Sequence, residues 1–150
     1  MSTRSARSAH PPTTCRWGGF PGCSRWRAGY RRSRSPPRWP TRFWARCTIP
    51  LPETPLVQAC ALTYLSDISS GLLAWDGEEA ATGPSLDHAL WFHRPARMDE
   101  WVLVDLAPRT VAGGRGWYDG GIYTADGTRA VTIAQEALFR FGKRPPGWNG

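Results

Sequence analysis

Apolar and polar positions follow three patterns along the chain, and each predicts a different kind of structure. Residues 1–40 show no apolar period of 2 or 3.6, so they predict neither a strand nor a helix. Residues 54–75 lie between a helix-start signal at Thr54-Pro55 and a helix-stop signal at Asp76-Gly77. Placed on a helix, they carry apolar side chains on nearly every side. They predict one long helix that is buried on most of its surface. Beyond a turn at Gly83-Pro84 the period falls to two or less, which predicts strands.

The second half of the chain predicts a sheet. Its strands are expected at residues 86–94, 101–106, 116–124 and 128–141. Ala125-Asp126-Gly127 is a tight-turn signal that joins the last two strands into an antiparallel hairpin. One helix followed by four strands in meander order predicts an α+β domain, in which an antiparallel sheet wraps around the helix. Residues 42–47 are a candidate edge strand.

Charge divides the chain near the same place as the apolar pattern. Residues 1–50 hold 11 Arg, no Lys and no Asp or Glu, whereas residues 51–150 hold 8 Lys plus Arg against 12 Asp plus Glu. We therefore expect a disordered Arg/Pro/Ser-rich segment at 1–40, a folded domain at 41–141 and a frayed tail at 142–150. Three other interpretations of residues 1–40 stay open. They are an organelle transit peptide, a nucleic-acid-binding tract of arginines and tryptophans, and a misassigned or frame-shifted stretch.

Location and thiol state follow from what the sequence contains. No run of 18 consecutive apolar residues is present, and the arginine-rich start lacks the apolar core of a secretory signal. We therefore expect a cytoplasmic protein with no membrane partner. Cys15, Cys23, Cys47 and Cys60 form no CxxC pair and are expected to be reduced, passive thiols.

Metal and cofactor signals are weak. His88 and His93 are five residues apart on one predicted strand, so they face opposite sides and cannot share a metal from that strand. Gly113–Gly116 precedes a strand rather than joining a strand to a helix, so it is weak evidence for phosphate binding. We expect no metal and no cofactor.

Three polar residues stand out against their local patterns. Asp67 lies in the apolar helix between Leu65 and Ile68, where an ionised carboxylate needs a partner, a cap or a water-filled cleft. Ser85 lies just after the predicted turn, where its hydroxyl either closes the turn or points into a cleft. Gln135 is the one amide on an apolar strand face, so it satisfies backbone groups or holds a ligand or water.

Several runs of the chain resemble the carboxyl-terminal half of the acyl-CoA thioesterase II family over about residues 41–141. The resemblance lies in Leu62-Thr63-Tyr64-Leu65-Ser66-Asp67, in Ser85-Leu86-Asp87-His88-Ala89-Leu90-Trp91-Phe92-His93-Arg94-Pro95 with Asp99-Glu100-Trp101, in Gly114-Arg115-Gly116 and in Ala134-Gln135-Glu136. The resemblance implies a hot-dog domain and hydrolysis of fatty acyl-CoA thioesters. It also implies that Asp67, Ser85 and Gln135 activate a water for direct attack, without an acyl-enzyme.

Two departures from the family pattern affect this prediction. The family's amino-terminal hot-dog half is replaced by the arginine-rich stretch, and Ala96 stands where an aromatic is usual. Because family members join two halves edge to edge near the acyl-CoA, we expect an active form to be a homo-oligomer, most simply a dimer. The alternatives are a catalytically inactive hot-dog fragment that binds acyl-CoA or a partner, and a nucleic-acid-binding protein that uses residues 1–40.

Overall fold

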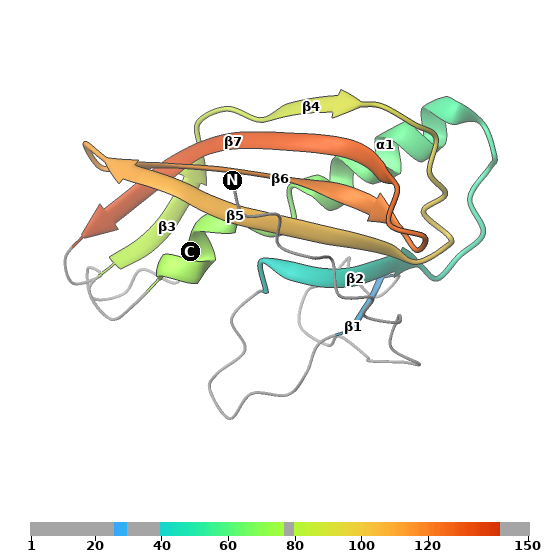
Figure 1. The fold of residues 1–150 in the computed structure, drawn as a ribbon, viewed down its shortest axis with the longest axis horizontal. Coiled ribbons are helices and arrows are strands. Elements are labelled where there is room, and N and C mark those ends of the chain that lie inside the picture. Colours follow the sequence, from blue (N-terminus) through green and yellow to red (C-terminus); the bar gives the residue numbers. More distant parts are fainter. Residues whose placement is uncertain (1–25, 30–39, 77–79, 142–150) are drawn as a thin grey trace.

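A computed structural model describes residues 26–29, 40–76 and 80–141 of the chain (Figure 1). Its helical elements are α1 (Pro55–Ser66) and a short 3₁₀ helix, η1 (Gly71–Trp75). Its strands are β1 (Trp26–Gly29), β2 (Arg42–Cys47), β3 (Ala80–Ser85), β4 (Ala89–Phe92), β5 (Val102–Ala112), β6 (Arg115–Thr124) and β7 (Arg129–Phe141).

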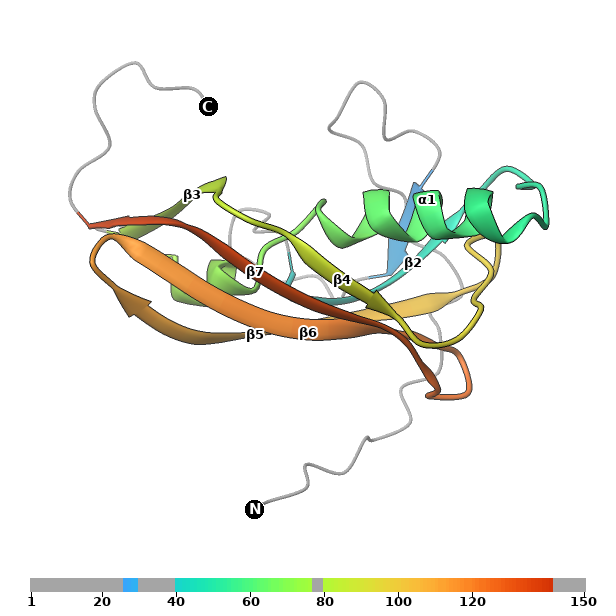
Figure 2. The same cartoon turned by 90° about the horizontal axis from the view of Figure 1, so that it is seen from above.

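All strands belong to one antiparallel sheet, which confirms the predicted α+β class. The strand order is β1-β2-β5-β6-β7-β3, and β4 pairs with β7 as well. Figure 2 shows the sheet curving beneath α1, so that the helix lies along its concave face.

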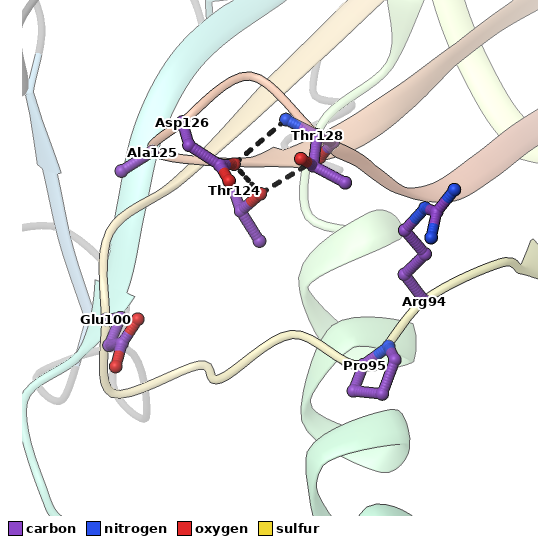
Figure 3. Close-up of a pocket in the computed structure, with 7 residues that line it drawn as sticks. All are labelled: Arg94, Pro95, Glu100, Thr124, Ala125, Asp126 and Thr128. Carbon is purple, nitrogen blue, oxygen red and sulfur yellow. Dashed lines mark hydrogen bonds between the residues drawn. The ribbon is translucent and has the colours of Figure 1, made fainter.

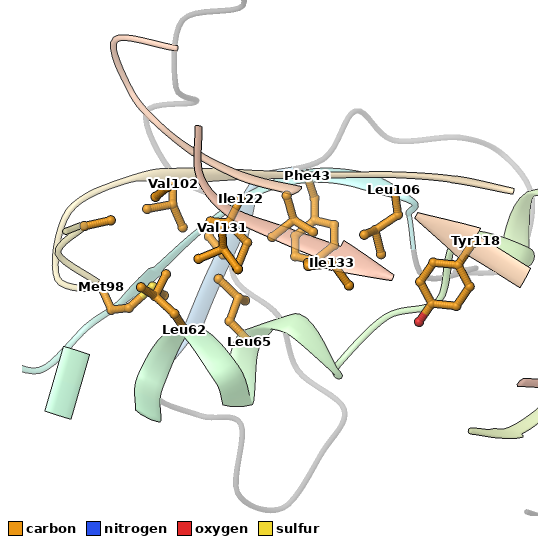
Figure 4. Packing of buried hydrophobic residues seen from close by; sticks show 14 of the residues in the cluster. Phe43, Leu62, Leu65, Met98, Val102, Leu106, Tyr118, Ile122, Val131 and Ile133 are labelled. Carbon is orange, nitrogen blue, oxygen red and sulfur yellow. The ribbon is translucent and has the colours of Figure 1, made fainter. Parts of the chain in front are cut away.

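The core lies between α1 and the concave face of the sheet (Figure 4). Leu62 and Leu65 of α1 are buried there, and each such side chain contributes about 1.5–3 kcal/mol by leaving water. The sheet contributes alternate residues from each of its central strands, which include Phe43, Val102, Val104, Leu106, Tyr118, Ile122, Val131 and Ile133.

The predicted long helix is wrong, because α1 ends at Ser66 and the chain turns before η1 begins. The break contains Asp67, Ser69 and Ser70, whose short polar side chains favour turns and caps over helix. The Ser70 hydroxyl accepts a hydrogen bond from Leu72 N at 3.2 Å and so caps η1. Asp67 is therefore the C-cap residue of α1 and does not lie inside a helix.

The prediction that α1 is buried on most of its surface is also wrong, because only one face of the helix is buried in the described residues. Buried positions repeat at helical spacing along one face, from Gln58 through Leu62 to Leu65 and Ser66. The other face is open to solvent, with Leu56 74% exposed and Tyr64 53% exposed.

Gln58 is a polar residue on the buried face of α1, and both ends of its amide are bonded. Its Nε2 donates to the Pro52 carbonyl at 3.0 Å, and Met98 N donates to its Oε1 at 2.8 Å. These bonds join the start of α1 to the connection that leads into β5.

The chain between the helix and β5 differs most from prediction. Gly83 and Pro84 lie inside β3 and are not a turn. Proline is tolerated there because β3 is the last strand of the sheet order and its register is irregular between Thr82 and Ser85. The strand predicted at residues 86–94 is the shorter β4, which pairs with β7, so the predicted four-strand meander holds only for β5-β6-β7.

The amino-terminal side of the sheet also differs from prediction. β2 was expected at an edge, but it lies between β1 and β5. β1 falls within residues 1–40, which were expected to be disordered, and its backbone pairs with β2 from Trp26↔Cys47 to Gly29↔Trp44. Pairing with β1 satisfies the backbone groups that β2 offers on that side. The rest of residues 1–39 and the predicted tail at 142–150 lie outside the described residues.

Two tight turns join the central strands. Gly113 and Gly114 connect β5 to β6 with φ of 60° and 73°, a conformation that glycine adopts without steric cost. The glycine-rich run is therefore a hairpin turn here. The predicted hairpin between β6 and β7 is confirmed, and Asp126 closes it by accepting hydrogen bonds from Thr124 Oγ1 at 2.5 Å and Thr128 N at 3.0 Å.

Among the described residues, one segment, Pro55–Trp75, is long and apolar enough by length and composition to cross a membrane. The same test is passed by core helices, and this segment is interrupted between α1 and η1. Cys47 is buried and Cys60 is exposed, and both are free thiols. Cys15 and Cys23 lie outside the described residues.

Candidate active site

The edge of the sheet is interrupted beside Gln135, between β3 and β4. Ser85 pairs with Ala137 and Ala89 pairs with Ala134. From Ser85 to Ala89 the edge chain advances by four residues, whereas β7 advances by three from Ala134 to Ala137. The edge chain therefore carries one extra residue. Such a β-bulge turns side chains away from the regular alternation of a strand.

The bulge is fixed by a side chain from within it. Asp87 Oδ1 accepts a hydrogen bond from Glu136 N at 2.7 Å and takes the place of a missing strand partner. At the two ends of the bulge, the side chains of Ser85 and His88 both reach Gln135. The bulge therefore brings two residues of one edge onto the same buried amide.

Gln135 is the centre of the polar cluster. Its side chain is on the core face of β7, as predicted, and the residue is 2% exposed. Its Nε2 donates to Asp67 Oδ1 at 3.3 Å and to Ser85 Oγ, and its Oε1 contacts His88 Nδ1. Every hydrogen-bonding group of this amide has a partner, which explains how it is tolerated among apolar neighbours.

The three residues singled out from the sequence are thus brought together. Asp67 comes from the end of α1, Ser85 from the end of β3 and Gln135 from the middle of β7. The Asp67 side chain is 60% exposed, so the carboxylate is open to water on the side away from Gln135. The cluster combines a carboxylate that accepts protons, a hydroxyl and an amide donor.

His88 is a member of the cluster that the sequence did not assign to it. Its Nδ1 lies 4.0 Å from Asp67 Oδ1, and its Nε2 lies 2.7 Å from Ser66 Oγ. His93, which was paired with it only as a rejected metal site, contacts Thr132 Oγ1 at 2.8 Å instead. Its place depends on the extra residue between β3 and β4, where a bulge frees side chains from strict alternation.

Tyr118 lies beneath the cluster, on the strand position opposite Gln135. It is fully buried, and its hydroxyl donates to the Ser69 carbonyl at 3.5 Å. Burial, together with the negative charge of Asp67, raises the pKa of Tyr118 to about 12. The phenol is therefore neutral at physiological pH.

A separate hollow of about 560 Å³ lies at the other end of the sheet (Figure 3). Its walls come from the β4–β5 connection and from the β6–β7 turn, and they are Arg94, Pro95, Glu100, Thr124, Ala125, Asp126 and Thr128. The hydrogen-bond partners of Gln135 are Asp67, Ser85 and His88, none of which lines this hollow, so the candidate site is the polar cluster at the bulge.

A curled antiparallel sheet around one helix, with this cluster at the helix end, defines a hot-dog domain of the thioesterase type. The family model described as "Acyl-CoA thioesterase C-terminal domain" matches residues 4–139. This chain belongs to that family. The match also includes residues 4–40, which lie outside the stretch of 41–141 where the motifs were recognised.

Relatives agree with this family. The chain is 36% identical over 100 residues to acyl-CoA thioesterase 2 of Haemophilus influenzae, an alignment that covers 61% of this chain and 35% of that protein. It is 34% identical over 103 residues to human acyl-coenzyme A thioesterase 8, covering 65% and 32%. The chain thus spans about a third of the length of these curated relatives.

Solved structures support the fold. The acyl-CoA thioesterase II of Mycobacterium marinum superimposes with a TM-score of 0.68 at 31% identity. The superposition covers 99% of this chain and 59% of that chain. The predicted hot-dog fold is therefore confirmed.

Proposed function

We propose that this chain hydrolyses fatty acyl-CoA thioesters to free fatty acid and CoA by direct attack of a water. The observation that carries the proposal is the contact of one buried amide, Gln135, with both Asp67 and Ser85. These bonds satisfy the buried amide, and they also bring a carboxylate and a hydroxyl to one point, where both can contact a single water. Relatives named as acyl-CoA thioesterases supply the substrate class.

The proposed chemistry follows from the donors and acceptors. Gln135 uses both amide hydrogens, one on Asp67 and one on Ser85. Asp67 keeps lone pairs toward solvent and accepts a hydrogen from the attacking water, while the Ser85 hydroxyl keeps its hydrogen to hold that water. The water oxygen bonds to the thioester carbonyl carbon, the carbon–sulfur bond then breaks, and the proton taken by Asp67 goes to the departing CoA thiolate.

A second copy of the chain is proposed to complete the site. Trp91 and Phe92 of β4 are 52% and 48% exposed, and among the described strands β4 pairs only with β7. His88, which directly precedes β4, contacts Ser66 at the end of α1 and lies 4.0 Å from Asp67, so β4 starts beside the cluster. A second β4 edge would cover apolar side chains and unpaired backbone groups, and it would shield the water beside Asp67.

An inactive hot-dog fragment that binds acyl-CoA or a partner is the second candidate. It is favoured by the 60% exposure of Asp67, since a carboxylate in open water is a weak general base for this reaction. Nucleic-acid binding through residues 1–40 stays a prediction, because the structure describes only residues 26–29 and 40 of that stretch.

Thiol release from acyl-CoAs of several chain lengths tests the proposal. We expect the purified full chain at micromolar concentration to release CoA with saturation kinetics. In a quenched reaction we expect the intact mass to show no acyl adduct. A folded dimer that releases no thiol at any chain length would favour the inactive fragment, and an acylated Ser85 would contradict the water mechanism.

A further inference from the structure

His88 connects the end of α1 to the central amide of the site. Its side chain is 22% exposed and lies between Ser66 Oγ, 2.7 Å from Nε2, and Gln135 Oε1, which contacts Nδ1. The residue that follows Ser66 is Asp67, so this histidine links the backbone that carries the carboxylate to the amide that binds it.

The directions of the hydrogen bonds are fixed by Asp67. An ionised carboxylate can only accept, so the group of Gln135 that lies 3.3 Å from Asp67 Oδ1 must be its NH₂. The amide oxygen must then face His88. Because an amide oxygen can only accept, His88 Nδ1 must carry a hydrogen and donate it.

The neutral and the charged ring of His88 both fit its contacts with Ser66 and Gln135, and both carry a hydrogen on Nδ1. In the neutral ring, Nε2 accepts the Ser66 hydroxyl hydrogen. In the charged ring, Nε2 donates to Ser66 Oγ, and that hydroxyl donates to the Thr63 carbonyl at 2.6 Å. In each case Nδ1–H points at Gln135.

We propose that His88 is a positioning residue that holds the Gln135 amide in the one orientation able to donate to both Asp67 and Ser85. This inference rests on the proposed hydrolysis. Without the donor at Nδ1, the buried amide oxygen loses its partner, and the amide can rotate to other orientations. If the amide rotated by half a turn, its oxygen would lie against the carboxylate of Asp67. The hydrogen bonds that hold Asp67 and Ser85 beside the water would then be lost.

Three substitutions of His88 separate its two ring nitrogens. His88→Asn places an amide nitrogen near the position of Nδ1, His88→Gln places one near the position of Nε2, and His88→Ala removes both. We expect His88→Asn to keep kcat within about fivefold of the wild type. We expect His88→Gln and His88→Ala to lower kcat by about 10- to 100-fold, with KM changed less than about twofold. His93→Ala is the matched control and should leave both constants unchanged, because His93 lies outside the cluster.

A double-substitution cycle separates positioning from a general structural effect. In the Gln135→Ala background, His88→Ala should lower kcat no further, because the amide on which His88 acts is already gone. Equal losses in His88→Asn and His88→Ala, or losses that multiply in the double variant, would overturn the proposal.

Nitrogen-15 NMR of the ring gives a test that does not depend on activity. In the wild type we expect the Nδ1 of His88 to carry a hydrogen, and we expect this signal to change in Gln135→Ala. An Nδ1 without hydrogen would overturn the inference. If the chain releases no thiol from any acyl-CoA, the proposed hydrolysis fails, and the NMR result still decides whether His88 orients Gln135.

Discussion

At the residue scale, the site is built from polar side chains that conflict with their own surroundings. Gln135 was recognised because an amide interrupts an apolar strand face, and the structure resolves that conflict with three side-chain partners. Asp67 was recognised for a similar reason, and the cap and the hydrogen-bond partner that the sequence left open as explanations are both present. It ends α1 and faces solvent, so it was never a buried charge.

His88 could not be found in the same way, because a histidine at the start of a strand breaks no pattern. Its role depends on the extra residue between β3 and β4, and a bulge cannot be located from alternation alone. Sequence reasoning therefore finds residues that contradict their local pattern and misses residues that are placed by irregular backbone.

Tyr118 gives a prediction about alkaline pH. Its pKa is raised to about 12 by burial first, so the neutral phenol favours the folded state. The stabilisation is complete below the unfolded pKa near 10 and is lost as pH rises toward 12. Between pH 8 and 12 the free energy of unfolding should fall by roughly 2 kcal/mol more in the wild type than in Tyr118→Phe. Urea unfolding at stepped pH measures this, and parallel losses in both proteins would contradict it.

At the element scale, the position of the site depends on how helix and strands end. α1 ends at Ser66, ahead of a segment whose Asp67, Ser69 and Ser70 favour turns over helix, and this places Asp67 at the helix end where it reaches Gln135. The sequence predicted the strands from β5 to β7 because they alternate clearly, and it predicted their hairpin from Asp126-Gly127. It did not predict β3, because Gly83 and Pro84 are turn signals that an edge strand can accommodate.

The bulge gives the prediction at this scale. Asp87→Ala removes the acceptor for Glu136 N and leaves that backbone group unpaired in the strand. We expect the free energy of unfolding to fall by about 1–2 kcal/mol and kcat to fall, because Ser85 and His88 lose their common support. Asp87→Asn keeps an oxygen acceptor and is the matched control, so it should lose less of both. Urea unfolding and thiol release measure the two effects, and equal behaviour of the two variants would show that Asp87 does not hold the bulge.

At the scale of the whole molecule, the described domain leaves several large apolar side chains exposed. They lie on α1, on β4 and between β3 and β4, with Leu56, Tyr64, Leu86, Trp91 and Phe92 each about half exposed or more. Exposed apolar side chains that gather in one patch are typical of an interface, and this supports the proposed dimer. This agrees with a chain that spans about a third of its curated relatives.

Dilution tests the proposed dimer. An interface of at least about 1,000 Å² should hold two copies together at micromolar concentration, and specific activity should fall when dilution dissociates them. Trp91→Asp places a charge on the exposed side of β4 and should shift the chain to monomer with loss of activity. Trp117→Asp on β6 is the matched control, because Trp117 is also exposed but lies on a central strand. Light scattering that shows an active monomer would contradict the proposal.

The replacement of Asp67 by Asn tests the central claim most directly. Asp67→Asn keeps the shape of the side chain and an oxygen near Gln135 but removes the group that accepts a proton from water. The predicted result is a fall in kcat of about 100-fold or more in the thiol-release assay, with unchanged thermal unfolding. Glu100→Gln removes an equally accessible carboxylate away from the site and should keep full activity. Undiminished hydrolysis by Asp67→Asn would contradict the claim that this carboxylate activates the water.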